Sequence, residues 1–164
     1  MNEENKKFFK KYLIYSFAFL IAAICAGVFY REFSKFYGVV NTYTPLGLAH
    51  PHLLTLGMLM MLVFGFVNIK LGVQDNKLIK IFTPIYVVAT SGASIMLIAR
   101  GIIDVLIKSG TIEGISSGVD GMISGISGLF HIVLGAMIIA IFVIRILSLK
   151  SKKRSKIKII SLLF

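Results

Sequence analysis

Four apolar stretches, each long enough to cross a lipid bilayer, constrain this chain more than any other feature. They cover Tyr12–Tyr30, Leu46–Ile69, Ile79–Ile107 and Met122–Leu147. At a helical rise of about 1.5 Å per residue, each stretch spans the roughly 30 Å hydrocarbon core of a membrane. Backbone polar groups cannot stay unpaired in lipid, so isolated apolar segments of this length form helices there. The sequence therefore predicts an all-α integral membrane protein, a single-domain four-helix bundle.

The lysines and arginines are distributed unevenly between the two ends of these predicted spans. If the N-terminus is cytoplasmic, 14 of the 18 basic residues lie on the cytoplasmic side. Basic loops stay in the cytoplasm during insertion, so we expect both termini to be cytoplasmic. The basic tail, residues 148–164, would then lie against anionic lipid headgroups. Because membrane insertion accounts for the net charge of +11, we expect no nucleic-acid partner.

The three histidines of the chain all lie in the apolar stretches or at their predicted outer edge. Imidazole is costly to bury in lipid, so a histidine in a membrane span indicates a functional site. His52 precedes Lys70 by 18 residues, and His131 precedes Arg145 by 14, which corresponds to roughly 27 Å and roughly 21 Å of helix above the inner boundary. We therefore expect His52 and His131 at similar depth in the outer leaflet, on two parallel helices.

The direction of His50 is open at this stage. Residues two apart on a helix point about 200° away from one another, so His50 and His52 cannot both bind one centre from a regular helix. Thr44 and Pro45 predict an N-cap and a first helical position, with Pro51 then kinking the helix from inside. Alternatively the helix begins at Pro51, with His50 in the non-helical position before it.

Small side chains share the helical face of His131 on the fourth span. They are Ser124, Ser127, Gly128 and Gly135. A flat ligand could lie in such a furrow, although small residues also allow two membrane helices to approach closely, as Gly121 and Gly125 would. Beside a histidine at the depth of another histidine, we favour a cofactor furrow. Gly57 and Gly65, on the side of the second span away from His52, predict a homodimer contact.

Charged and sulfur-containing side chains allow further interpretations. Arg100 lies slightly above the predicted histidine level, where it suits carboxylates of a bound ligand; the alternative is an ion pair with Asp104 at the headgroup boundary. A methionine cluster near His-x-His could bind Cu(I), although methionine more often fills gaps between helices. Its members are Met58, Met60 and Met61.

The chain resembles an uncharacterised family of small four-span bacterial membrane proteins. The resemblance rests on four segments, residues 26–33, 50–58, 99–102 and 123–131, and extends over nearly the whole chain. It implies a multi-pass protein of the bacterial cytoplasmic (inner) membrane. It implies no particular activity.

Residues 50–57, followed by Phe64 and Gly65, also resemble the His-x-His helix of the catalytic subunit of heme-copper oxidases. In that family the second histidine binds the low-spin heme together with a histidine on another helix. The resemblance therefore implies that His52 and His131 are the axial ligands of a heme b. The role of His50 stays open, and oxygen reduction is not implied. Gly128, Gly135 and Arg100 would complete the binding site.

These features predict a membrane b-type heme-binding protein for electron transfer or gas sensing, with a redox protein or a quinone as partner. Whether the protein is an enzyme stays open. If it is one, we expect a component of a heme-dependent oxidoreductase. One alternative is a metal or proton transport protein in which His50, His52 and Asp104 line a polar cavity. The other is a membrane assembly or scaffold factor without a cofactor.

Overall fold

The computed structural model describes residues 3–40, 42–73 and 75–163, with side chains described as far as Leu149. Within these ranges the elements are α1 (Glu3–Phe36), α2 (Leu46–His52), the π-helical segment η1 (Leu53–Leu59), α3 (Met60–Leu71), α4 (Lys77–Lys108) and α5 (Ser117–Leu163). Because α2, η1 and α3 follow one another directly, the described chain has four helical spans, each long and apolar enough to cross a membrane. The predicted all-α, four-span fold is confirmed. The side chains of the basic tail beyond Leu149 lie outside the described part.

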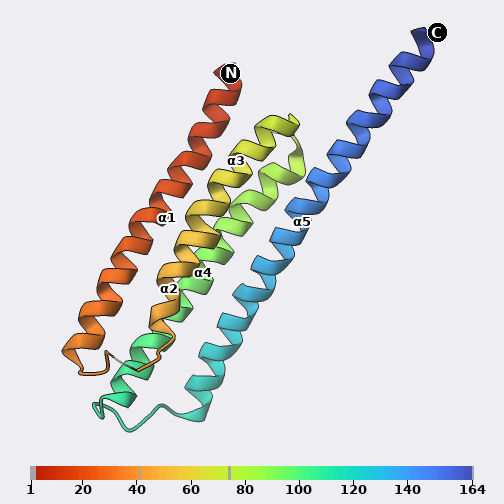
Figure 1. The fold of residues 1–164 in the computed structure, drawn as a ribbon. Coiled ribbons are helices and arrows are strands. Elements are labelled where there is room, and N and C mark those ends of the chain that lie inside the picture. The colour runs from red at the N-terminus through yellow and green to blue at the C-terminus, as the bar shows by residue number, and fades with distance from the viewer. Residues whose placement is uncertain (1–2, 41, 74, 164) are drawn as a thin grey trace.

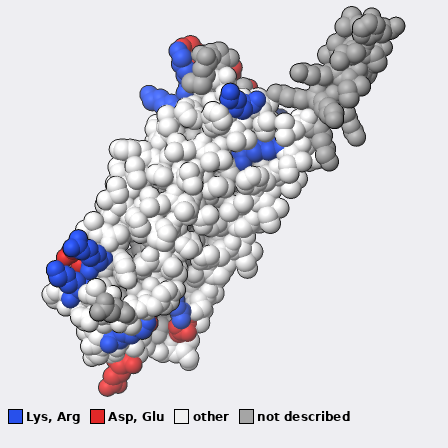
Figure 2. Space-filling view, in the orientation of Figure 1, with Lys and Arg blue, Asp and Glu red and all other residues white. Residues whose placement is uncertain are grey.

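The four spans lie side by side, and both termini are at one end of the bundle (Figure 1). α1 packs on the second span, the second span packs on α4, and α5 packs mainly on α4 with a smaller contact to α3. Charged side chains gather at the two ends, with an uncharged band between them on the face that Figure 2 shows. This distribution is the one that a bundle crossing a bilayer needs, because charges are costly in its hydrocarbon core.

Pro51 makes the second span irregular. The span begins at Leu46, with Pro45 at the N-cap position in αR conformation, so the first of the two expected start sites is correct. The predicted cap is wrong, because the Thr44 hydroxyl is buried and has no hydrogen-bond partner among the described residues. Pro51 lies inside α2, and η1 begins two residues later at Leu53. Proline removes one helical hydrogen bond and crowds the preceding turn, and here the chain continues as a wider π-helix.

Glycines of the second span pack against α1. A Cβ at Gly57 would overlap the Phe19 ring, and a Cβ at Gly65 would lie 2.9 Å from Cβ of Tyr12. Gly57 and Gly65 were predicted to be free for a homodimer contact. That prediction is wrong, because close packing inside the chain uses both positions. Self-association itself stays a prediction.

Polar side chains from all four spans form one hydrogen-bonded chain near the end that carries the termini. Thr83 of α4 donates to the carbonyl of Ile79 at 2.8 Å, so the Tyr12 hydroxyl of α1 must donate to Thr83 Oγ1, also at 2.8 Å. Asn68 Nδ2 of α3 donates to Tyr12 Oη at 3.2 Å, and Arg145 Nε of α5 donates to Asn68 Oδ1 at 3.0 Å. This chain joins the spans laterally in a region where water cannot compete.

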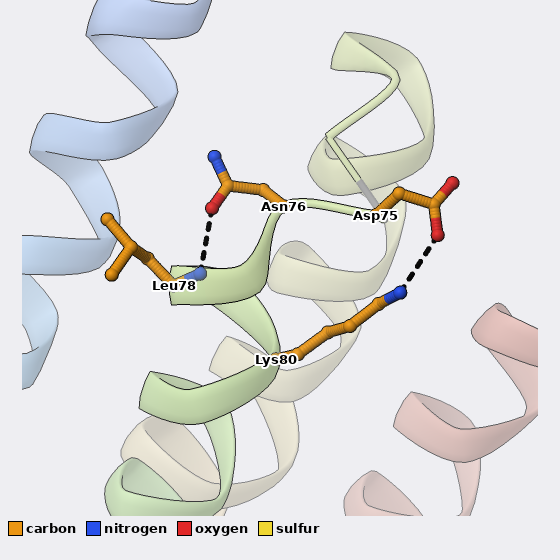
Figure 3. Close-up of polar contacts among 4 residues, drawn as sticks. All are labelled: Asp75, Asn76, Leu78 and Lys80. Carbon is orange, nitrogen blue, oxygen red and sulfur yellow. Dashed lines mark hydrogen bonds and ion pairs between the residues drawn. The ribbon is translucent and has the colours of Figure 1, made fainter.

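The turn between α3 and α4 determines where α4 begins. α3 ends at Leu71, and the next residue, Gly72, has the left-handed φ of 61° that favours glycine at this position. The Asn76 side chain then accepts a hydrogen bond from the Leu78 N–H at 2.9 Å, and Lys80 forms an ion pair with Asp75 at 2.9 Å (Figure 3). An asparagine N-cap satisfies one of the free N–H groups at the start of a helix, so Asn76 fixes the residue at which α4 begins.

Candidate functional site

The rings of His52 and His131 lie next to each other, edge to face, between the second span and α5. His52 is the last residue of α2, and His131 lies on α5. Their ring centroids are 6.1 Å apart, and the ring planes are inclined at 77°. His52 is half-buried and His131 is exposed. The structure thus brings together the two histidines that the sequence places at one depth.

Each of these two imidazoles is held by its own helix. His52 Nδ1 lies 2.9 Å from the Leu48 carbonyl oxygen, and His131 Nδ1 lies 2.7 Å from the Ser127 carbonyl oxygen. A carbonyl oxygen can only accept, so Nδ1 must donate, and Nε2 is the ring nitrogen not used in this bond. Within the described ranges neither Nε2 has a hydrogen-bond partner. Metal-binding histidines typically show this arrangement, with the second ring nitrogen donating to a carbonyl.

The ring separation has the right size for one metal ion between the rings. An imidazole nitrogen binds a transition metal at about 2 Å and lies about 1 Å from its ring centre, so opposed ligands have centroids about 6 Å apart. No group of three or more His, Cys, Asp or Glu side chains in the described part of the chain could hold a metal ion. Two histidines alone suit a metal whose remaining ligands come from a flat macrocycle.

Glycines beside His131 leave one face of α5 uncovered. No other protein atom lies within 4 Å of the position that a Cβ would take at Gly128 or Gly135. Elsewhere in the bundle glycines do allow close packing: a Cβ at Gly92 would overlap the Phe130 ring, and a Cβ at Gly101 would overlap the Leu46 backbone. Packing within the chain therefore does not account for the α5 glycines.

His50 points toward α1. Its Nδ1 lies 2.8 Å from the Ala23 carbonyl oxygen, and a Cβ at Gly27 would lie only 3.0 Å from that nitrogen. His50 and His52 thus face two different neighbours, as their two-residue spacing on a helix requires. Asp104, the third residue of the transport alternative, forms an ion pair with Lys108 at 2.8 Å. The structure does not bring these three side chains together.

Arg100 bonds to the beginning of α5. Its Nη1 donates to Ser124 Oγ at 2.7 Å and lies 3.0 Å from Asp120 Oδ1. The alternative pair of Arg100 with Asp104 does not form. An arginine placed four residues before a carboxylate is the less favourable order on one helix, and α5 supplies a better placed acid. Ser124 precedes His131 by two helical turns, roughly 10 Å, so Arg100 lies toward the end of the bundle that carries the α4–α5 connection.

The methionine cluster packs into the core. Met61 is fully buried, and Met58 and Met60 pack against the same buried cluster. They therefore behave as the gap-filling side chains that methionine commonly supplies.

Two residues that matter for the site were missed by sequence reasoning. Asp120 could have been found as an acid at the start of the fourth span, at the same end of the bundle as the basic Arg100. Tyr86 carried no local signal: its hydroxyl donates to the Leu56 carbonyl at 2.5 Å, a partner 30 residues away.

Comparison with known families places the chain. A family model described as a protein of unknown function (DUF2871) matches residues 9–148. The chain belongs to this family. The match takes in all four spans of this DUF2871 member, which confirms the resemblance to an uncharacterised four-span family. The comparisons with curated proteins and with solved structures found no match.

Proposed function

We propose that this DUF2871 member is a b-type heme-binding membrane protein with His52 and His131 as axial ligands. One observation carries the proposal. The two rings lie edge to face with centroids 6.1 Å apart, and each ring bonds through Nδ1 to a carbonyl of its own helix. Because each Nδ1–H is donated to a carbonyl, Nε2 is the ring nitrogen left to bind a metal.

The other residues of the site support a heme in separate ways. Gly128 and Gly135 leave the face of α5 beside His131 free for a flat macrocycle. The carboxylates of such a ligand could project toward the positive charge of Arg100, which its ion pair with Asp120 partly neutralises. A heme bound here would supply one-electron redox chemistry, and two imidazole ligands suit electron transfer more than catalysis. A membrane quinone or another redox protein would exchange the electrons.

The experiment is a spectrum of the protein purified from cells supplied with heme. We expect an intense Soret band and sharp visible bands on reduction, because two neutral imidazoles keep the iron low-spin. His52→Ala and His131→Ala should each abolish heme binding or produce a high-spin spectrum. A gas sensor would show itself by binding carbon monoxide to an open axial position, whereas a six-coordinate heme would resist it.

His50→Ala is the matched control, since it removes the same side chain two residues away but faces α1. It should leave the low-spin spectrum nearly intact. A colourless wild-type protein with native helicity would refute the proposal, and so would a spectrum that depends on His50 but not on His52.

We further propose that both termini are cytoplasmic in the bacterial inner membrane. The termini lie at one end of the bundle (Figure 1). In the sequence, 14 of the 18 basic residues belong to the two terminal segments or flank the α3–α4 turn, and such a bias is typical of the cytoplasmic side. In a Cys25→Ser background, an impermeant maleimide should label Ser116→Cys in intact cells but Asp75→Cys only after lysis. The reverse pattern would show the opposite orientation.

A further inference from the structure

The π-helical segment after His52 leaves a backbone carbonyl without its usual partner. In a regular α-helix the N–H of Met60 would bond to the carbonyl of Leu56, four residues earlier. Here the Met60 N–H bonds to the carbonyls of Thr55 and Gly57 and passes over Leu56. A carbonyl that loses its helical donor inside a membrane needs another one, because no water is available.

A tyrosine from the neighbouring span supplies that donor. Tyr86 of α4 is fully buried, and its hydroxyl donates to the Leu56 carbonyl at 2.5 Å. From the other side, the Ser16 hydroxyl of α1 donates to the Met58 carbonyl at 3.0 Å. Side chains of two different helices therefore hold the π-helical register of η1.

We infer that Tyr86 is a positioning residue for His52, an inference that rests on the proposed function only where heme is concerned. η1 begins at the residue after His52, so its register sets how His52 is turned relative to the core face of the span. Shifting a helix by one residue rotates everything on one side of the shift by about 100° relative to the other. By donating to the carbonyl that the Met60 N–H passes over, Tyr86 stabilises the π-helical register of η1 and, with it, the position of His52 beside His131.

Tyr86→Phe tests this in the full-length protein in lipid nanodiscs, because it removes only the hydroxyl and keeps the packed ring. The first readout uses heme-free protein with ¹⁵N-labelled imidazoles, the His52 signals being assigned by their loss in His52→Gln. We expect the His52 signals to shift or broaden relative to those of the wild type. Amide hydrogen exchange over residues 53–60 should become about fivefold faster, as expected for one lost hydrogen bond.

The second readout is the heme-loaded protein. Tyr86→Phe should change the electron paramagnetic resonance g-values of the oxidised low-spin iron, which report the orientation of the axial imidazoles. A merely structural role would lower stability without moving these values or the His52 signals.

Tyr12→Phe is the matched control. It makes the same change in the same buried cluster, but in the hydrogen-bonded chain near the termini. It should leave the His52 signals and the exchange of residues 53–60 as in the wild type. Unchanged His52 signals and exchange in Tyr86→Phe would overturn the inference, as would equal changes in Tyr12→Phe. A wild type that binds no heme would refute the proposed function alone, since the heme-free readouts still decide the role of Tyr86.

Discussion

Arg145 of α5 donates a hydrogen bond from Nε to Oδ1 of Asn68 of α3, across 3.0 Å. Arg145 is only 4% exposed, and its guanidinium lies over the Phe64 ring at 4.2 Å from the centroid. Within the described ranges no carboxylate forms an ion pair with it. An amide oxygen and an aromatic face, both on α3, therefore stabilise this buried cation of α5.

Removing the amide should destabilise the bundle strongly. Asn68→Leu takes away the acceptor of Arg145 and the donor to Tyr12, leaving a buried charge without its partner. We expect a loss of about 3 kcal/mol in the free energy of unfolding, measured by denaturant titration in mixed micelles. Asn76→Ala, which removes only a helix cap at the α3–α4 turn, should cost about 1 kcal/mol. Asn68→Leu combined with Arg145→Leu should recover part of the loss, because no buried charge then remains. A cost for Asn68→Leu no larger than for Asn76→Ala would contradict this account.

Filling the open face of α5 should block cofactor binding without unfolding the protein. Gly128→Leu places a side chain where no protein atom lies within 4 Å of the added Cβ, one turn from His131. We expect at least about tenfold weaker heme binding in a titration of heme-free protein, with unchanged helicity. Gly118→Leu, equally open but on the opposite side of α5 from His131, should bind heme normally. Equal affinities of wild type and Gly128→Leu would mean that the ligand does not lie against this face.

Gly101 provides the opposite case. Its position against the Leu46 backbone leaves no space for a methyl group. Gly101→Ala should therefore destabilise the fold by about 2 kcal/mol through overpacking. Comparing the two glycines separates space that the fold uses from space that it leaves free.

Arg100 and Asp120 should shift the reduction potential of a bound heme in opposite directions. Arg100→Ala removes a cation, which favours the oxidised, more positive iron and lowers the midpoint potential. Asp120→Asn removes an anion from the same ion pair and should raise it. We expect shifts of about 30 mV, roughly a threefold change in the redox equilibrium, in a potentiometric titration. Glu32→Gln at the end of α1 serves as the control and should leave the potential unchanged. Shifts of the same sign would place the pair too far from the iron to act through charge.

The sequence by itself determined the number of spans and the level of the histidines. Apolar length decides the first, because a backbone in lipid must bond within its own helix. Helical rise decides the second: distances counted from Lys70 and Arg145 placed His52 and His131 at one depth, and their rings lie 6.1 Å apart. The two-residue spacing likewise separated His50 from His52.

Tertiary structure alone decided which neighbours these side chains meet. Gly57 and Gly65 contact α1, and Arg100 pairs with Asp120 of α5 although Asp104 lies four residues away on its own helix. The direction of His50 and the hold of Tyr86 on Leu56 depend on the π-helical register of η1. Local spacing describes a single regular helix, whereas the order of helices around the bundle and the extra residue of a π turn depend on contacts between segments far apart in the chain.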